Sequence, residues 1–137
     1  MGQQQILLIV LGAIIVGIAT VVGINMFNES AAQANLDAVS NDLLNLASRA
    51  QQYYRKPSSM GGGGKTFLGL TADSQGLLQL TAQAANDNGG FAISTPGDST
   101  QVIIQGTGLE DGDGDGNPVL VSCTVTATGA SLVVSER

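Results

Sequence analysis

A short acidic segment carries the densest chemical signal in the chain. Asp111, Asp113 and Asp115 alternate with glycines and are followed by Asn117. This spacing matches positions 1, 3, 5 and 7 of a calcium-binding loop, where alternate residues direct hard oxygen ligands at one ion. The glycine that such a loop needs at position 6 for its sharp turn is present as Gly116. The first half of the segment therefore predicts a calcium site.

The second half of that pattern fails. Position 12, a bidentate glutamate in a calcium loop, is Ser122 here. We therefore expect at most a truncated site, completed by Glu110, by another loop or by water. The alternative is a solvated acidic connection, whose aspartates and glycines serve turn geometry. Calcium is the one cofactor that the residues suggest, and nothing in the sequence requires one.

A second segment comes close to a phosphate-binding pattern. Residues 59–66, SMGGGGKT, differ from the P-loop pattern GxxxxGK[ST] in having Ser59 in place of the first glycine. A P-loop lies between a buried strand and a helix, which aim its amides at phosphate, whereas YYRKP precedes this segment. We expect the helix to end at Pro57 and a flexible surface loop to follow.

Composition argues against catalysis and against nucleic-acid binding. The 137 residues include no histidine and one cysteine, and no nucleophile with a base partner is visible. Cys123 shares an alternating face with valines, which predicts a buried side chain. The net charge is −6 and the five basic residues form no patch that would attract phosphates. We expect a protein that is not an enzyme and has no nucleic acid partner.

The amino-terminal part is uncharged and apolar. The first charged residue is Glu29, and 17 of the 22 residues in the range 6–27 are hydrophobic. As a helix this range extends about 33 Å, close to the hydrocarbon thickness of a bilayer. It predicts a transmembrane helix. A cleavable signal peptide is the competing interpretation, but its apolar region is usually shorter and follows a basic residue.

The helix is expected to continue beyond the membrane. No proline or glycine occurs between residues 28 and 56, so nothing forces an end before Pro57. An apolar stripe with alternating steps of three and four residues consists of Leu36, Val39, Leu43, Leu46, Ala50 and Tyr53. We therefore predict one helix over residues 6–56. It divides the chain into residues 1–28, apolar all round, and residues 29–137, which form a globular head.

The carboxy-terminal part reads as strands. The range 119–128 alternates between apolar and polar residues, which buries one face of a strand. Residues 91–94, 101–105 and 131–134 are shorter strand candidates, and Gly129 suits a tight turn before the last of them. Residues 74–85 have only weak helical periodicity. These elements predict an α+β fold, in which a small antiparallel sheet covers the stripe of the long helix.

The whole arrangement resembles the type IV pilin superfamily. The likeness in sequence is concentrated in residues 1–12, MGQQQILLIVLG, which are similar to a mature pilin amino terminus. In that family a glutamate at the fifth mature position neutralises a neighbouring subunit's terminal amine. Here Gln5 takes that place if Met1 is first, and Leu7 takes it if Gln3 is first. The chain also departs from the family in lacking a proline near the middle of the span and a carboxy-terminal disulfide.

The resemblance implies a structural subunit of an extracellular, pilus-like filament. Its partners would be copies of itself, the membrane before assembly and a filament assembly machinery. Its location would be the inner membrane as a monomer and the cell surface as a filament. The residues expected to matter for assembly are Gln5, Gly12, Gly17 and Gly23. The glycines would allow the helix to extend or bend, and the alternative is that glycine is simply frequent in membrane helices.

Two other functions remain open from the sequence. The first is a membrane-anchored module whose head binds calcium or another ligand through the acidic segment. The second is a minor pilin-like component of a secretion or uptake machine, which would be scarce relative to a major subunit.

Overall fold

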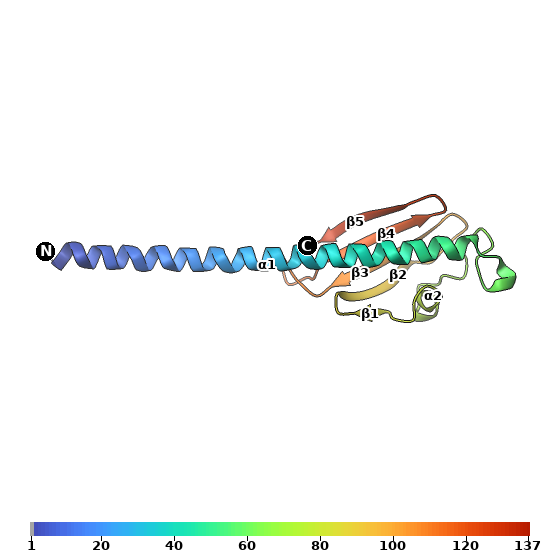
Figure 1. Cartoon of the computed structure of the whole chain (residues 1–137), viewed down its shortest axis with the longest axis horizontal. Helices are drawn as coiled ribbons and strands as arrows, with labels where there is room; N and C mark the ends of the chain where they lie inside the picture. The colour runs from blue at the N-terminus through green and yellow to red at the C-terminus, as the bar shows by residue number, and fades with distance from the viewer. Residues whose placement is uncertain (1) are drawn as a thin grey trace.

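A computed structural model describes residues 2–137, so Met1 and its suggested place as first mature residue lie outside the described residues. The long helix α1 (Gly2–Arg55) is followed by the 3-10 helix η1 (Ser58–Met60), the short helix α2 (Ser74–Leu78) and the strands β1 (Ala85–Asn86), β2 (Gly89–Thr95), β3 (Gln101–Gly108), β4 (Leu120–Thr126) and β5 (Ala130–Glu136). One part of α1 projects alone and the other lies along the sheet (Figure 1). The predicted α+β fold is confirmed.

Helix α1 runs without interruption through its apolar and amphipathic parts. It begins four residues before the predicted start and ends one residue before the predicted end. At 54 residues it is about 81 Å long. The amide of Lys56 still donates to the carbonyl of Gln52 at 2.9 Å, and Pro57, which has no amide hydrogen, follows. The chain therefore leaves the helix where the sequence predicts a break.

The five strands form one antiparallel sheet in the order β1-β2-β3-β4-β5. Each strand pairs with the next along the chain, as in a meander. Strands β2, β3 and β5 extend beyond their predicted ranges, whereas β4 begins one residue later and ends two earlier than expected. The turn predicted at Gly129 joins β4 to β5, with its carbonyl accepting from the amide of Thr126 at 2.8 Å.

Two small elements went beyond the sequence prediction. Strand β1 has only two residues, too few to show an alternating pattern. The weakly periodic range 74–85 contains α2, which has five residues and is capped by Asp73. The Asp73 carboxylate accepts a hydrogen bond from the amide of Gly76 at 3.0 Å. A cap of this kind stabilises a helix too short to persist alone.

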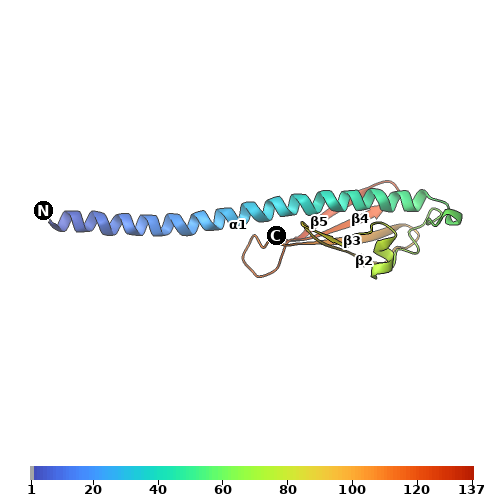
Figure 2. The same cartoon turned by 60° about the horizontal axis from the view of Figure 1, so that its bottom comes forward.

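The core lies between the carboxy-terminal part of α1 and one face of the sheet (Figure 2). Five of the six predicted stripe residues are buried, and Tyr53 is half-buried at the edge, its hydroxyl donating to the carbonyl of Leu68 at 2.8 Å. Gly106 of β3 allows a close approach, because a Cβ there would stand 2.6 Å from Cγ1 of Val39. The stripe of α1 therefore packs on the sheet of the same chain. The alternating buried residues of β4 belong to the same core.

We predict that Leu43→Ala lowers the free energy of unfolding of the head by about 2–5 kcal/mol, because Leu43 is fully buried. Leu44→Ala is the matched control: the next side chain is 43% exposed and its loss should change stability by less than about 0.5 kcal/mol. Denaturation of the full chain in detergent, followed by the fluorescence of Tyr53 and Tyr54, measures both. Equal effects of the two variants would contradict this core.

Candidate functional site

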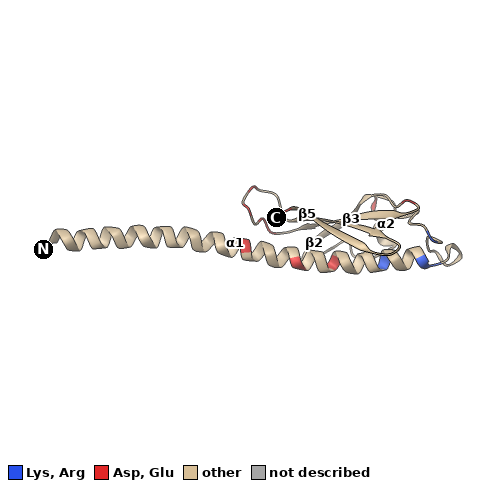
Figure 3. Ribbon diagram, turned by 90° about the horizontal axis from the view of Figure 1, so that it is seen from above, with Lys and Arg blue, Asp and Glu red and all other residues tan. Residues whose placement is uncertain are grey.

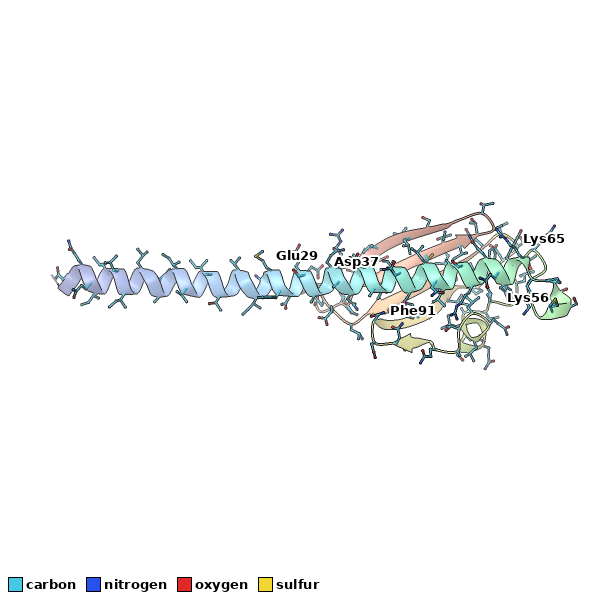
Figure 4. All side chains as sticks on the ribbon, in the orientation of Figure 1. Glu29, Asp37, Lys56, Lys65 and Phe91 are labelled. Atoms are coloured by element: carbon cyan, nitrogen blue, oxygen red, sulfur yellow. The ribbon has the colours of Figure 1, made fainter. Side chains whose placement is uncertain are left out.

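The amino-terminal part of α1 is a rod of exposed apolar side chains. From Ile6 to Phe27 its large hydrophobic residues are between 50% and 78% exposed, and side chains project on all sides (Figure 4). We call residues 6–27 the stem. It lies in a helix long and apolar enough to cross a membrane, and its most apolar window is not buried against the rest of the described chain. So large an apolar surface requires lipid or other protein to cover it.

The backbone of the stem and one of its few polar side chains form their hydrogen bonds within the helix. Its amides and carbonyls are paired within the helix. The hydroxyl of Thr20 donates to the carbonyl of Val16 at 2.8 Å. Both features lower the cost of placing the stem in an apolar environment, because unpaired polar groups there are expensive.

The residues expected to matter for assembly all lie on this helix. Gln5 is exposed in the first turns of α1. A Cβ on Gly12, Gly17 or Gly23 would meet no atom within 4 Å outside the local helix backbone. The helix continues through all three glycines, so within one chain they neither bend it nor contact the head. Their role in assembly stays a prediction.

The acidic segment folds into a loop that gathers its carboxylates. One oxygen each from Asp111, Asp113 and Asp115 lie within 4.8 Å of one another. The carboxylate of Asp111 accepts from the amides of Gly114 and Gly116, each at 2.7 Å. Both glycines have positive φ, +79° and +91°, a conformation that side chains disfavour. The structure therefore brings together the first three predicted ligands.

The two remaining positions of the calcium-loop pattern, 7 and 12, lie in different elements. Asn117 lies in the same loop, and its side-chain amide donates to the carboxylate of Asp115 at 2.8 Å. Ser122 lies inside β4, paired with Gln105 and Val133, and so belongs to the sheet instead of the loop. The loop thus keeps the truncated form that the sequence predicts.

Local hydrogen bonds stabilise the charge of this loop. The amides of Gly114 and then Gly116 hold the pKa of the Asp111 carboxyl below its usual range. Hydrogen bonds from the amide and side chain of Asn117 lower the pKa of Asp115, against smaller opposing effects from desolvation and from the charge of Asp111. Three ionised carboxylates this close repel one another, and a divalent cation would relieve the repulsion. The same hydrogen bonds also suit an acidic turn without an ion, so calcium binding remains a prediction.

The acidic loop lies beside the point where the stem enters the head. The amide of Gly112 donates to the carbonyl of Arg137 at 3.1 Å, and a Cβ on Gly112 would stand 2.6 Å from Cβ of Ala32. A cavity of about 240 Å³ opens there between α1 and the loop, with Glu29 and Asp113 among its lining residues. The loop therefore marks the stem side of the head.

The glycine-rich segment caps α1. The amides of Gly63, Gly64 and Lys65 donate to the carbonyls of Tyr53, Lys56 and Tyr54, respectively, at 2.7–3.0 Å. Helix ends leave carbonyls without partners, and these amides satisfy them. These amides are therefore not free to bind phosphate, and the chain that follows contains no helix before α2. The glycine-rich segment thus caps the end of α1, and these hydrogen bonds hold its backbone in place.

Cys123 is fully buried, as predicted, and burial raises the pKa of its thiol, which makes it unreactive.

The side chain of Asn35 donates to the carbonyl of Asn88 at 2.8 Å and accepts from the amide of Leu109 at 2.9 Å. Asp42 accepts from the side-chain amides of Asn86 and Asn88, each at 2.8 Å.

Sequence reasoning missed Asn35 and Asp42 as the residues that hold the β1–β2 turn to α1. A signal was present, because residues seven apart lie two turns apart on the same side of a helix. Both flank the apolar stripe. Polar residues at that spacing beside a buried stripe indicate contacts with the element that covers it.

The fold defines a class of chain: an exposed apolar stem continuous with a helix that packs on an antiparallel sheet. Comparison with protein-family models, with curated proteins and with solved structures found no significant match to this sequence or fold. The functional argument therefore rests on the stem and the head themselves.

We predict that calcium raises the thermal midpoint of the full chain in detergent, because an ion that binds only the folded loop stabilises it by mass action, by about 2.7 kcal/mol at 100 times Kd. Asp113→Asn should abolish the shift. This carboxylate accepts one loop bond, from the amide of Asp115 at 3.2 Å, so its replacement disturbs the loop least.

Asp87→Asn, in the exposed β1–β2 turn, is the matched control and should leave the shift unchanged. Differential scanning calorimetry with and without a chelator provides the measurement. An unchanged midpoint at millimolar calcium, or an equal shift in the Asp113→Asn chain, would count against the site.

Proposed function

We propose that the chain is a structural, non-enzymatic subunit of a type IV pilin-like extracellular filament. The observation that carries the proposal is the stem, which is apolar on all sides and continuous with the helix that forms the head's core. The monomer would reside in the membrane by its stem, and the stems would become the core of the filament.

The physical properties of the stem suit an exchange of lipid for other stems. Its backbone groups are bonded internally, so it can leave the bilayer without exposing unpaired amides. Its side chains carry no charge between Gln3 and Asn28, so contact with similar helices buries no unpaired ion. Lipid tails and apolar helices are similar surroundings for such side chains, which keeps the cost of exchange low.

The head is suited to remain outside the filament core. All 16 charged residues lie from Glu29 onward. The buried residues of α1 begin at Ala32, so the head's core takes no side chain from the stem. Transfer of the stem between environments therefore leaves the packing of the head intact.

A second candidate is a membrane-anchored module that binds calcium. The observation that favours it is the cluster of three carboxylates in the acidic loop. In this function the stem serves only as an anchor, and we would expect single chains in the membrane. The two candidates differ in whether stems contact one another.

Electron microscopy and mass spectrometry of filaments sheared from cells that express the chain test the proposal. We expect this chain to be the repeating component, with the stems in contact at the filament axis. Cell-surface filaments built from another subunit, with this chain confined to the membrane as a monomer, would overturn it. A small number of copies within filaments of another subunit would instead indicate a minor component.

We predict that Ile15→Asp abolishes filaments. Ile15 is 57% exposed near the middle of the stem, and an aspartate at the centre of a membrane helix costs about 2.5–3.5 kcal/mol on insertion scales. Ile15→Leu keeps the apolar surface and should assemble as the unchanged chain does. The yield of sheared filaments measures the effect.

The thermal midpoint of the head should be the same in both variants, because the stem contributes nothing to the head's core. Filaments formed by the aspartate variant at the full yield would contradict a core made of stems.

A further inference from the structure

The end of the head farthest from the stem is basic. Arg55 and Lys56 are exposed in and just beyond the last turn of α1, and the glycine-rich segment that caps this helix holds Lys65 beside them. Figure 4 shows Lys56 and Lys65 at this end. We call these three residues the distal cations. Two carboxylates in the chain segments near this end are engaged locally: Asp73 caps α2, and Asp98 accepts from the amides of Thr100 and Gln101.

The end of the head nearest the stem is acidic. The loop that follows β3 lies against the first polar turns of α1 through the contact of Gly112 with Ala32. The exposed or half-buried carboxylates gathered at this end are those of Glu29, Glu110, Asp111, Asp113, Asp115 and Glu136, with Arg137 as the accompanying cation. We call Glu110, Asp111, Asp113 and Asp115 the proximal carboxylates. Along α1 the acidic residues precede the basic ones (Figure 3).

We infer that the distal cations of one copy dock on the proximal carboxylates of a second copy. This deepens the proposed function and rests on it, because it assigns the contact between heads in the filament. The occupant is a second copy because one chain presents both complementary surfaces. They lie at opposite ends of the head and cannot meet within it: from Ala31 to Arg55 α1 rises about 36 Å.

The charge distribution also selects the geometry of the contact. Two distal ends would bring cations together and two proximal ends would bring carboxylates together, and like charges across a contact are disfavoured. The remaining pairing is head-to-tail, with the two chains pointing in the same direction. A head-to-tail contact leaves one free surface at each end and therefore extends into a polymer when its rotation does not close a ring.

The stem is compatible with the shift along the helix axis that head-to-tail docking requires. A copy shifted by one head length, about 36 Å, places its stem level with the lower copy's head, since the stem is about 33 Å long. Copies at intermediate heights must then supply the stem contacts, as in a helical polymer whose rise is smaller than the head. The docking therefore sets which heads touch, while the stems provide the apolar burial.

Paired charge reversals test the docking in the full chain. The distal variant is Arg55→Glu with Lys56→Glu and Lys65→Glu, which changes the summed charge of the distal cations from +3 to −3. The proximal variant is Glu110→Lys with Asp113→Lys and Asp115→Lys, which changes the summed charge of the proximal carboxylates from −4 to +2. Each chain is assembled by removing detergent in the presence of a chelator, so that no divalent ion screens the carboxylates. Sedimentation and electron microscopy then give the concentration at which filaments form.

We expect each variant alone to need at least about a ten-fold higher concentration than the unchanged chain, because its contact joins like charges. An equal mixture of the two should assemble as the unchanged chain does, since the reversed distal end of one fits the reversed proximal end of the other. Arg55→Lys with Lys56→Arg preserves both charges and should also assemble normally.

The outcomes separate the docking from the proposed function. Normal assembly of either reversed variant alone, or failure of the mixture to recover, overturns the docking and leaves the filament standing. Failure of the unchanged chain to assemble under any condition overturns the filament and the docking together. Recovery in the mixture itself shows that the variants fold, because only folded heads can present the reversed surfaces.

Discussion

The contact between the stripe of α1 and the apolar face of the sheet is the interaction on which the structure depends. It is the main source of buried apolar area in the head, since α1 contributes seven buried residues and the sheet supplies most of the rest. It also keeps the second part of α1 helical, because helices are stabilised in proteins chiefly by packing of an apolar face. Without it the chain would be a long apolar helix followed by an unsupported meander.

That contact makes the stem and the head one mechanical unit. The stem is the continuation of a helix whose other part is clamped by the sheet, with Asn35 and Asp42 bonded to the β1–β2 turn beside it. The direction of the stem relative to the head is therefore defined by a continuous helix instead of a linker. In the proposed filament, such a chain would place its head at a defined position when its stem is packed.

Two loops illustrate how similar sequence signals lead to different roles. The glycine-rich segment has P-loop spacing, yet its amides donate to the carbonyls at the end of α1, which removes them from ligand binding. The acidic loop uses its amides differently. They stabilise the charges of Asp111 and Asp115 and leave three carboxylate oxygens close together on an exposed surface. What each loop can bind is decided by where its own backbone hydrogen bonds go.

The sequence by itself determined the long helix, its apolar and amphipathic parts, the alternating strand that buries Cys123 and the spacing that gathers Asp111, Asp113 and Asp115. These features are local, because helical and strand periodicity and loop spacing involve neighbouring residues. Only the tertiary structure decided that the glycine run caps α1, that Asn35 and Asp42 secure β1 and β2, and that the acidic and basic groups lie at opposite ends of the head. Each of these depends on residues far apart in the chain becoming neighbours, and that is set by how the sheet packs on the helix.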